Sequence, residues 1–204
     1  TDSAKKNFKS LDYLFDRKQI SSTDFYEQLI EAGKYKHQQV LLPVSFNLPA
    51  IIFDSSNKNL MPDSYTLSLE QIKTAAIGYN RKKASGAFSK IGFTPLSNDD
   101  FLYLTTKLCN VNFREEKGQI IWNEEELEKT SYYLKTWITE ANSSAQEEQD
   151  FAFKYLFMPS YRQVTSGRTL FSYITSDELF KVTKEQNLNI DYRWICNNSI
   201  MPIE

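Results

Sequence analysis

The segment from residue 41 to residue 60, LLPVSFNLPAIIFDSSNKNL, constrains the fold of this chain more than any other stretch. Pro43 and Pro49 lack the N–H group that a strand donates to its neighbour, so each suits the end or the edge of a strand. The β-branched pair Ile51 and Ile52 favours a strand. A single long central strand is therefore excluded here.

We predict instead two short strands, 40–44 and 49–53, joined by an extended crossing segment. The polar residues Ser45 and Asn47 would be exposed at that crossing. If the chain passes there from one body to another, a binding cleft is expected beside it, because ligand pockets favour domain interfaces.

Composition indicates a folded globule. The 204 residues are 41% hydrophobic and 14% aromatic, enough for one large domain or two small ones. A net charge of −2 gives no reason to expect nucleic acid or an anionic membrane as partner. The single histidine, His37, rules out a multi-histidine metal site, and we expect no cofactor.

Apolar periodicity and capping signals predict helices that alternate with strands. Ser68 with Gln71 forms a capping box, and Asp24 and Asn123 are predicted N-caps. The predicted helices cover residues 24–32, 68–79, 101–108, 124–141, 151–157 and 176–186. The other predicted strands cover residues 90–96, 118–122, 166–175 and 190–196, and 142–150 is read as a linker. This alternation predicts an α/β fold with a mostly parallel sheet flanked by helices.

Several segments, in this order, resemble the carbohydrate-binding group of the extracellular solute-binding proteins of ABC transporters, which are maltose-binding-protein-like. Residues 42–47, Leu-Pro-Val-Ser-Phe-Asn, resemble the family's first hinge crossing. The stretches GQIIWNEEELEKTSYYLKTWITEAN and SGRTLFSYITSDELF resemble a helix and a cleft strand of its second lobe. Phe171 stands where the family has Met, and Asp54 where it has Asn.

The resemblance covers most of residues 11–204 and implies a type II periplasmic-binding-protein-like second lobe with hinge strands. Residues 1–43 would be the tail of the first lobe, 44–189 the second lobe, and 190–204 a strand that returns toward the hinge. The chain is thus expected to be a fragment centred on the second lobe. The resemblance also implies a monomer outside the cytoplasm, periplasmic or extracellular, anchored by a missing N-terminal segment and partnered by permease subunits.

Sugars are held by aromatic faces and by amide, carboxylate and hydroxyl groups. Three loops carry such groups at places where the resemblance implies ligand contacts. Each also has a structural reading: the first two as helix caps, the third as a plain hinge. The candidate ligand-binding residues are Ser97, Asn98, Asp99, Asp100 and Tyr103 in the first loop, Tyr173, Thr175, Ser176 and Asp177 in the second, and Ser45, Phe46 and Asn47 at the crossing.

The leading hypothesis is a non-catalytic receptor that captures a mono- or oligosaccharide, or another solute, for import. A glycosidase would need paired carboxylates, but the clusters 99–100 and 124–126 place neighbouring side chains in different directions. No Ser-His-Asp set accompanies His37. A surface interaction module on the same fold remains the alternative, and the departures at Phe171 and Asp54 are compatible with it.

Overall fold

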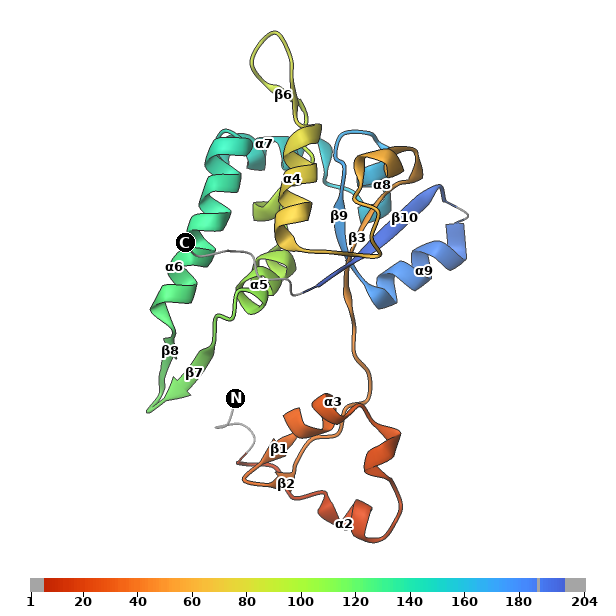
Figure 1. Ribbon diagram of the computed structural model, residues 1–204, viewed down its shortest axis with the longest axis vertical. Coiled ribbons are helices and arrows are strands. Elements are labelled where there is room, and N and C mark those ends of the chain that lie inside the picture. Colours follow the sequence, from red (N-terminus) through yellow and green to blue (C-terminus); the bar gives the residue numbers. More distant parts are fainter. Residues whose placement is uncertain (1–5, 187, 197–204) are drawn as a thin grey trace. The chain divides into compact units, whose positions relative to one another are not determined.

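The computed structural model describes residues 6–186 and 188–196, which divide into two compact units (Figure 1). The first unit comprises the chain up to residue 46 together with residues 113–122. The second comprises residues 47–112 and the chain from residue 123 onward. No helix in the described part of the chain combines the length and apolarity that crossing a bilayer requires.

The second unit is built around strand β3 (Pro49–Asp54), whose side chains from Ala50 to Phe53 are all fully buried. Successive side chains of a strand point to opposite faces of a sheet. Ile51 and Phe53 accordingly join one apolar core, while Ala50 and Ile52 join another on the opposite face. An uninterrupted apolar strand therefore requires cover on both sides.

Helices supply that cover and make the second unit three-layered (Figure 1). One face packs against α4 (Leu69–Tyr79), α5 (Asp99–Leu108) and α6 (Glu124–Thr136), which continues into a π-helical turn, η4 (Trp137–Ala141). The other face packs against α8 (Ser160–Thr165) and α9 (Ser176–Gln186). The remaining elements of the unit are η2 (Ser55–Leu60), β5 (Arg81–Lys82), β6 (Phe88–Lys90), η3 (Pro95–Ser97) and α7 (Ala145–Tyr155).

The four-stranded sheet has the order β4-β10-β3-β9, with β4 at Thr66–Leu67, β9 at Ser172–Thr175 and β10 at Ile190–Ile195. β3 is antiparallel to both β10 and β9, and only β4 and β10 run parallel. The predicted mostly parallel sheet is therefore wrong. A mostly parallel sheet would require that strands alternating with helices along the chain join the same sheet. The described chain between β4 and β9 adds no strand to the four-stranded sheet.

Two of the predicted strands show why. Residues 118–122 contain β8 (Gln119–Trp122), which pairs only with β7 (Phe113–Glu116) in a separate hairpin. Within 90–96 the strand β6 ends at Lys90, and the buried segment that follows bonds to the chain near β9 without forming a ladder. The N–H groups of Leu170 and Phe171 both donate to the carbonyl of Gly92, at 3.0 Å each.

Strong local signals gave correct elements. Ser68 and Gln71 form the predicted capping box at the start of α4, and β3 and β10 lie close to their predicted bounds. One other prediction was wrong. Residues 142–150 are no linker, because Ser144 caps α7 and Glu148 is buried on that helix. Asn123 is the N-cap residue of α6, as predicted, but its side chain makes no capping hydrogen bond.

The first unit holds α2 (Asp12–Asp16), η1 (Ser22–Asp24) and α3 (Glu27–Ala32). It also holds a small hairpin of β1 (Lys34–Tyr35) and β2 (Gln38–Gln39). The predicted strand 40–44 is absent, because residues 41–48 pair with no other strand. Asp24 is no helix N-cap either, since it is the last residue of η1 and accepts the Ser21 N–H at 3.0 Å.

The two compact units do not test the predicted division into receptor lobes. The unit boundary near the crossing falls after Phe46. β10 lies inside the sheet of the second unit, between β4 and β3. Residues 197–204 of the predicted returning segment lie outside the described residues, and the assignment of the two units to receptor lobes stays a prediction.

Gly92 lies directly against the backbone of helix α4. A Cβ added there would overlap the carbonyl oxygen of Ala76 and lie 2.6 Å from its carbonyl carbon. We expect Gly92→Ala to lower the free energy of unfolding by about 1–3 kcal/mol, because backbone atoms must move apart. Denaturant titration measures this. Gly78→Ala is the matched control, since nothing lies within 4 Å of that added Cβ and alanine favours helix; equal destabilisation by both variants would contradict the steric account.

Candidate functional site

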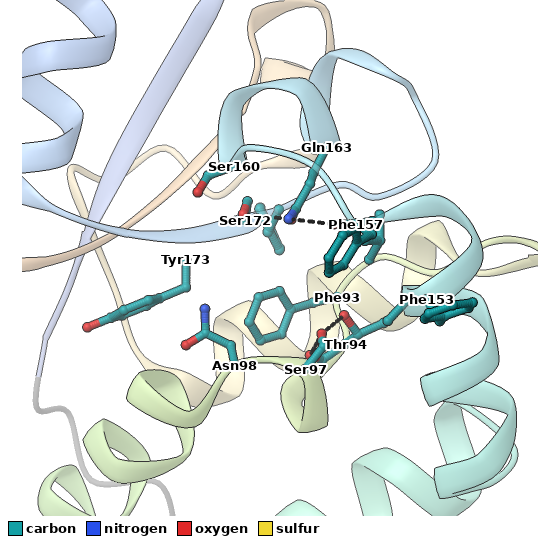
Figure 2. A pocket seen from close by; sticks show the side chains of 13 residues that line it. Phe93, Thr94, Ser97, Asn98, Phe153, Phe157, Ser160, Gln163, Ser172 and Tyr173 are labelled. Atoms are coloured by element: carbon teal, nitrogen blue, oxygen red, sulfur yellow. Dashed lines mark hydrogen bonds between the residues drawn. The ribbon is translucent and has the colours of Figure 1, made fainter.

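The second unit contains a pocket of about 260 Å³ (Figure 2). Its walls come from the connection before α5, from the end of α7, from α8 and from the start of β9. Its lining residues are Phe93, Thr94, Ser97, Asn98, Ala152, Phe153, Leu156, Phe157, Ser160, Gln163, Phe171, Ser172 and Tyr173. Elements far apart in sequence therefore build one site.

Aromatic rings form both the floor and the rim of this pocket. Phe93 and Phe171 are buried and belong to the apolar core. Phe153 and Phe157 also line the pocket, yet they are 82% and 90% exposed. Large apolar rings left in water beside a hollow are a feature of binding surfaces.

Two polar groups of the lining have no partner within the described chain. Asn98 uses its Oδ1 to accept the Phe101 N–H at 2.8 Å, and its Nδ2 bonds to no described residue. The hydroxyl of Tyr173 is likewise without a hydrogen-bond partner among the residues described. In Figure 2 the Asn98 amide lies between the rings of Tyr173 and Phe93. One donor amide and one phenol are thus free to meet a ligand.

The other polar lining groups are occupied by the protein itself. Ser97 Oγ donates to the Thr94 carbonyl at 2.7 Å. Gln163 Nε2 donates to the carbonyls of Leu156 and Met158, and its Oε1 accepts from Ser172 Oγ at 2.9 Å. These bonds fix the shape of the walls.

All 13 lining residues are uncharged. Two carboxylates interact with lining residues without lining the pocket themselves. Ser160 Oγ donates to Glu178 Oε1 at 3.1 Å, and burial, aided by the Asp100 carboxylate, raises the pKa of Tyr173. The arrangement suits a neutral, partly apolar ligand and offers no partner for a formal charge.

Of the residues predicted from sequence, Ser97, Asn98 and Tyr173 come together in this pocket. Asp99, Asp100 and Tyr103 lie on α5 as exposed residues outside the lining.

Thr175, Ser176 and Asp177 of the second predicted loop form hydrogen bonds with one another and with residues 47–48. Thr175 Oγ1 donates to Asp177 Oδ1 at 2.6 Å, which is the main cause of the lowered pKa of Asp177. Buried Ser176 accepts the Leu48 N–H at 3.1 Å and donates to Asn47 Oδ1 at 3.3 Å. Thr175, Ser176 and Asp177 do not line the pocket, in contrast to Tyr173 of the same loop.

The crossing residues do not form one group. Asn47 belongs to the second unit, whereas Ser45 and Phe46 belong to the first. There the ring of Phe46 meets that of Tyr26 edge to face at 5.4 Å.

The site predicted from the sequence did not include Phe153, Phe157, Ser160 and Gln163 of the lining. A usable signal was present in FAFKYLF, residues 151–157, where four aromatic rings stand at alternate positions. A helix with a period of 3.6 residues cannot bury all four on one side. Some of these rings had to be exposed.

Solved structures of sugar-bound proteins share this architecture. CpMnBP1 with mannobiose bound and CpMnBP1 with mannotriose bound match with TM-scores of 0.64 and 0.65, at 15% and 14% sequence identity. Each match covers 94% of this chain and 50% of that protein. A cyclo/maltodextrin-binding protein complexed with maltotetraose matches with a TM-score of 0.53 at 16% identity, over 89% of this chain and 46% of that one.

The chain shares their fold. It spans about half the length of each of these proteins. The resemblance predicted from sequence is confirmed at the level of the fold, since identities this low show no more than that. No protein-family model and no curated protein matches the sequence.

A buried polar network lies directly behind the pocket wall. Its centre is Glu148, which is 0% exposed. Its Oε1 accepts the Leu96 N–H and its Oε2 accepts Asn142 Nδ2, both at 2.7 Å. Burial raises the pKa of Glu148 to about 7, against the lowering effect of these two hydrogen bonds. In the described chain, no three His, Cys, Asp or Glu residues gather as a metal ion would require.

The raised pKa of Glu148 predicts that stability falls as pH rises from about 4.5 to 7. In that range the unfolded chain releases the proton while the folded chain still holds it, so rising pH favours unfolding. The contribution lost is about 3 kcal/mol for a shift of this size. Urea titration at each pH measures the slope, which should be smaller in Glu148→Gln and unchanged in the exposed control Glu147→Gln. Parallel profiles for wild type and Glu148→Gln would contradict the assignment.

Proposed function

We propose that this chain binds a neutral mono- or oligosaccharide, without catalysing a reaction on it, and that the pocket between α5, α7, α8 and β9 supplies part of the contacts. The observation that carries the proposal is an uncharged pocket that joins exposed aromatic faces to unpartnered polar groups. The likeness to sugar-bound structures supports the same ligand class.

The chemistry of a sugar suits this lining. The CH-rich face of a pyranose ring can stack on the exposed rings of Phe153 and Phe157. Its hydroxyl groups both donate and accept, so they can satisfy Asn98 Nδ2 and the Tyr173 hydroxyl. A charged solute would have to leave water without an opposite charge to meet it, which is costly.

The finer part of the proposal concerns the whole protein. It is a receptor of the ABC-transporter type, acting as a monomer outside the cytoplasm and passing its solute to membrane permease subunits. A ligand that binds one conformation better than another shifts the population toward it, which is how such a receptor would signal that it is loaded. Because the chain spans half the length of the structures it matches, this step rests on the likeness of fold alone.

Calorimetric titration with mannobiose, mannotriose and maltotetraose tests the ligand class. We expect saturable binding and, in Phe157→Ala, an affinity about tenfold lower, as expected from the loss of one stacking contact. Phe180→Ala is the matched control, because Phe180 is also exposed but does not line the pocket. Absence of binding across a wider saccharide panel would favour a surface that contacts another protein.

Tyr173→Phe tests the polar half of the site. The change removes one hydroxyl that has no partner in the described chain, so the free energy of unfolding should stay within about 0.5 kcal/mol of wild type. Saccharide affinity should fall about two- to tenfold, since one ligand hydrogen bond is lost. Thermal unfolding and calorimetry on the same samples separate the two effects. A loss of stability with unchanged affinity would show that the hydroxyl acts within the fold.

A further inference from the structure

Glu148 acts on the pocket without lining it. It lies one turn into α7, fully buried, and is absent from the pocket wall. Its contact with the Leu96 N–H reaches the turn η3, which holds Ser97 of the lining. The carboxylate is thus joined by one hydrogen bond to the backbone next to Ser97 and Asn98, which line the pocket.

Asn142 extends this hold to the pocket floor. The Nδ2 that donates to Glu148 also donates to the carbonyl of Phe93 at 3.0 Å. Its Oδ1 accepts Asn80 Nδ2 at 3.1 Å, and Asn80 Oδ1 accepts the Gly92 N–H at 2.8 Å. The backbone at three positions of the segment 92–96 is therefore fixed by one continuous chain of side chains.

The two protonation states of Glu148 differ in what they can hold. An ionised carboxylate only accepts hydrogen bonds, so it can receive both the Leu96 N–H and Asn142 Nδ2. A protonated carboxyl oxygen still accepts hydrogen bonds but accepts them more weakly than a carboxylate oxygen, so protonation of either oxygen weakens one of the two contacts. The buried network is therefore strongest with the ionised form.

No charged side chain of the described chain forms an ion pair with Glu148. Of the charged residues in the segments packed around it, Lys90 is partly buried and donates to the Tyr79 hydroxyl at 3.4 Å. The others are exposed, namely Lys82, Lys83, Asp99, Asp100, Glu140, Glu147, Asp150 and Lys154. Burial dominates the raised pKa, and no charged neighbour contributes to it. The titration near neutral pH therefore belongs to Glu148 and its two donors.

We infer that Glu148 is a positioning residue, and that its ionised carboxylate holds segment 92–98 in the shape that accepts ligand. The inference deepens the proposed function and rests on it for the identity of the ligand. Binding should draw the proton from Glu148, so saccharide affinity should rise between pH 5.5 and pH 8. A rise of about two- to tenfold corresponds to one hydrogen bond strengthened.

The first measurement needs no ligand. Amide resonances are followed by NMR from pH 5.5 to 8 in wild type, in Glu148→Gln and in the exposed control Glu147→Gln. We expect Leu96, Thr94 and Asn98 to shift together with one midpoint near pH 7 in wild type and in the control, and not in Glu148→Gln. If Leu96 shifts while Thr94 and Asn98 stay unchanged, Glu148 does not position the pocket and the inference is overturned.

The second measurement is calorimetry with mannotriose over the same pH range. An affinity that rises with pH in wild type and in Glu147→Gln, but stays flat in Glu148→Gln, supports the inference. Equal affinity at all pH values in wild type overturns it, and this test does not depend on whether the variant folds. If wild type binds no saccharide at any pH, the proposed function fails, and the shifts of Thr94 and Asn98 alone then decide whether Glu148 positions the pocket.

Discussion

The second unit depends on the complete burial of β3 from both sides. Ala50, Ile51, Ile52 and Phe53 are each 0% exposed, and each pair of alternate residues enters a different core. At about 25 cal/mol per Å² of buried apolar surface, such a strand contributes several kcal/mol only when helices cover both faces. The three-layered arrangement is the consequence, and the polar site lies at its margin, where β9 and the segment after β6 meet the helices.

The same layering explains why the pocket wall needs a polar brace. Segment 92–98 carries buried residues but pairs with no strand, so its N–H and C=O groups require other partners. The N–H groups of Leu170 and Phe171 donate to the Gly92 carbonyl, and the network of Asn80, Asn142 and Glu148 bonds the Gly92 N–H, the Phe93 carbonyl and the Leu96 N–H. Because side chains supply its hydrogen bonds, segment 92–98 can keep an irregular backbone shape, whereas pairing with a strand would make it extended. That shape is what turns Asn98 and Phe93 toward a common hollow.

Local chemistry was predictable from the sequence, and tertiary pairing was not. The capping box of Ser68 and Gln71 and the β-branched run at β3 act within a few residues, so the pattern alone identifies them. Ser97, Asn98 and Tyr173, which line one pocket, were predicted from the family resemblance and, for Ser97 and Asn98, from the tendency of helix caps at strand ends to face ligands. The direction of β3 against β9 and β10 depends on segments more than 100 residues away, which no local pattern encodes. The burial of Glu148 was not predicted either, because its polar neighbours in NSSAQEEQD resemble a solvated loop and its partner Leu96 is distant in the sequence.

Burying a carboxylate without a cationic partner costs folding free energy. The location of Glu148 behind the pocket wall indicates what this carboxylate contributes to the site. Placed in the lining, Glu148 would present its charge to the ligand and favour cations over neutral solutes. Placed behind the wall, it meets only an N–H and an amide, and the 13 residues that the ligand would touch stay uncharged. Hydrogen bonds to an ionised acceptor are also stronger than those between neutral groups. The network can therefore hold the backbone firmly while the pocket itself stays neutral.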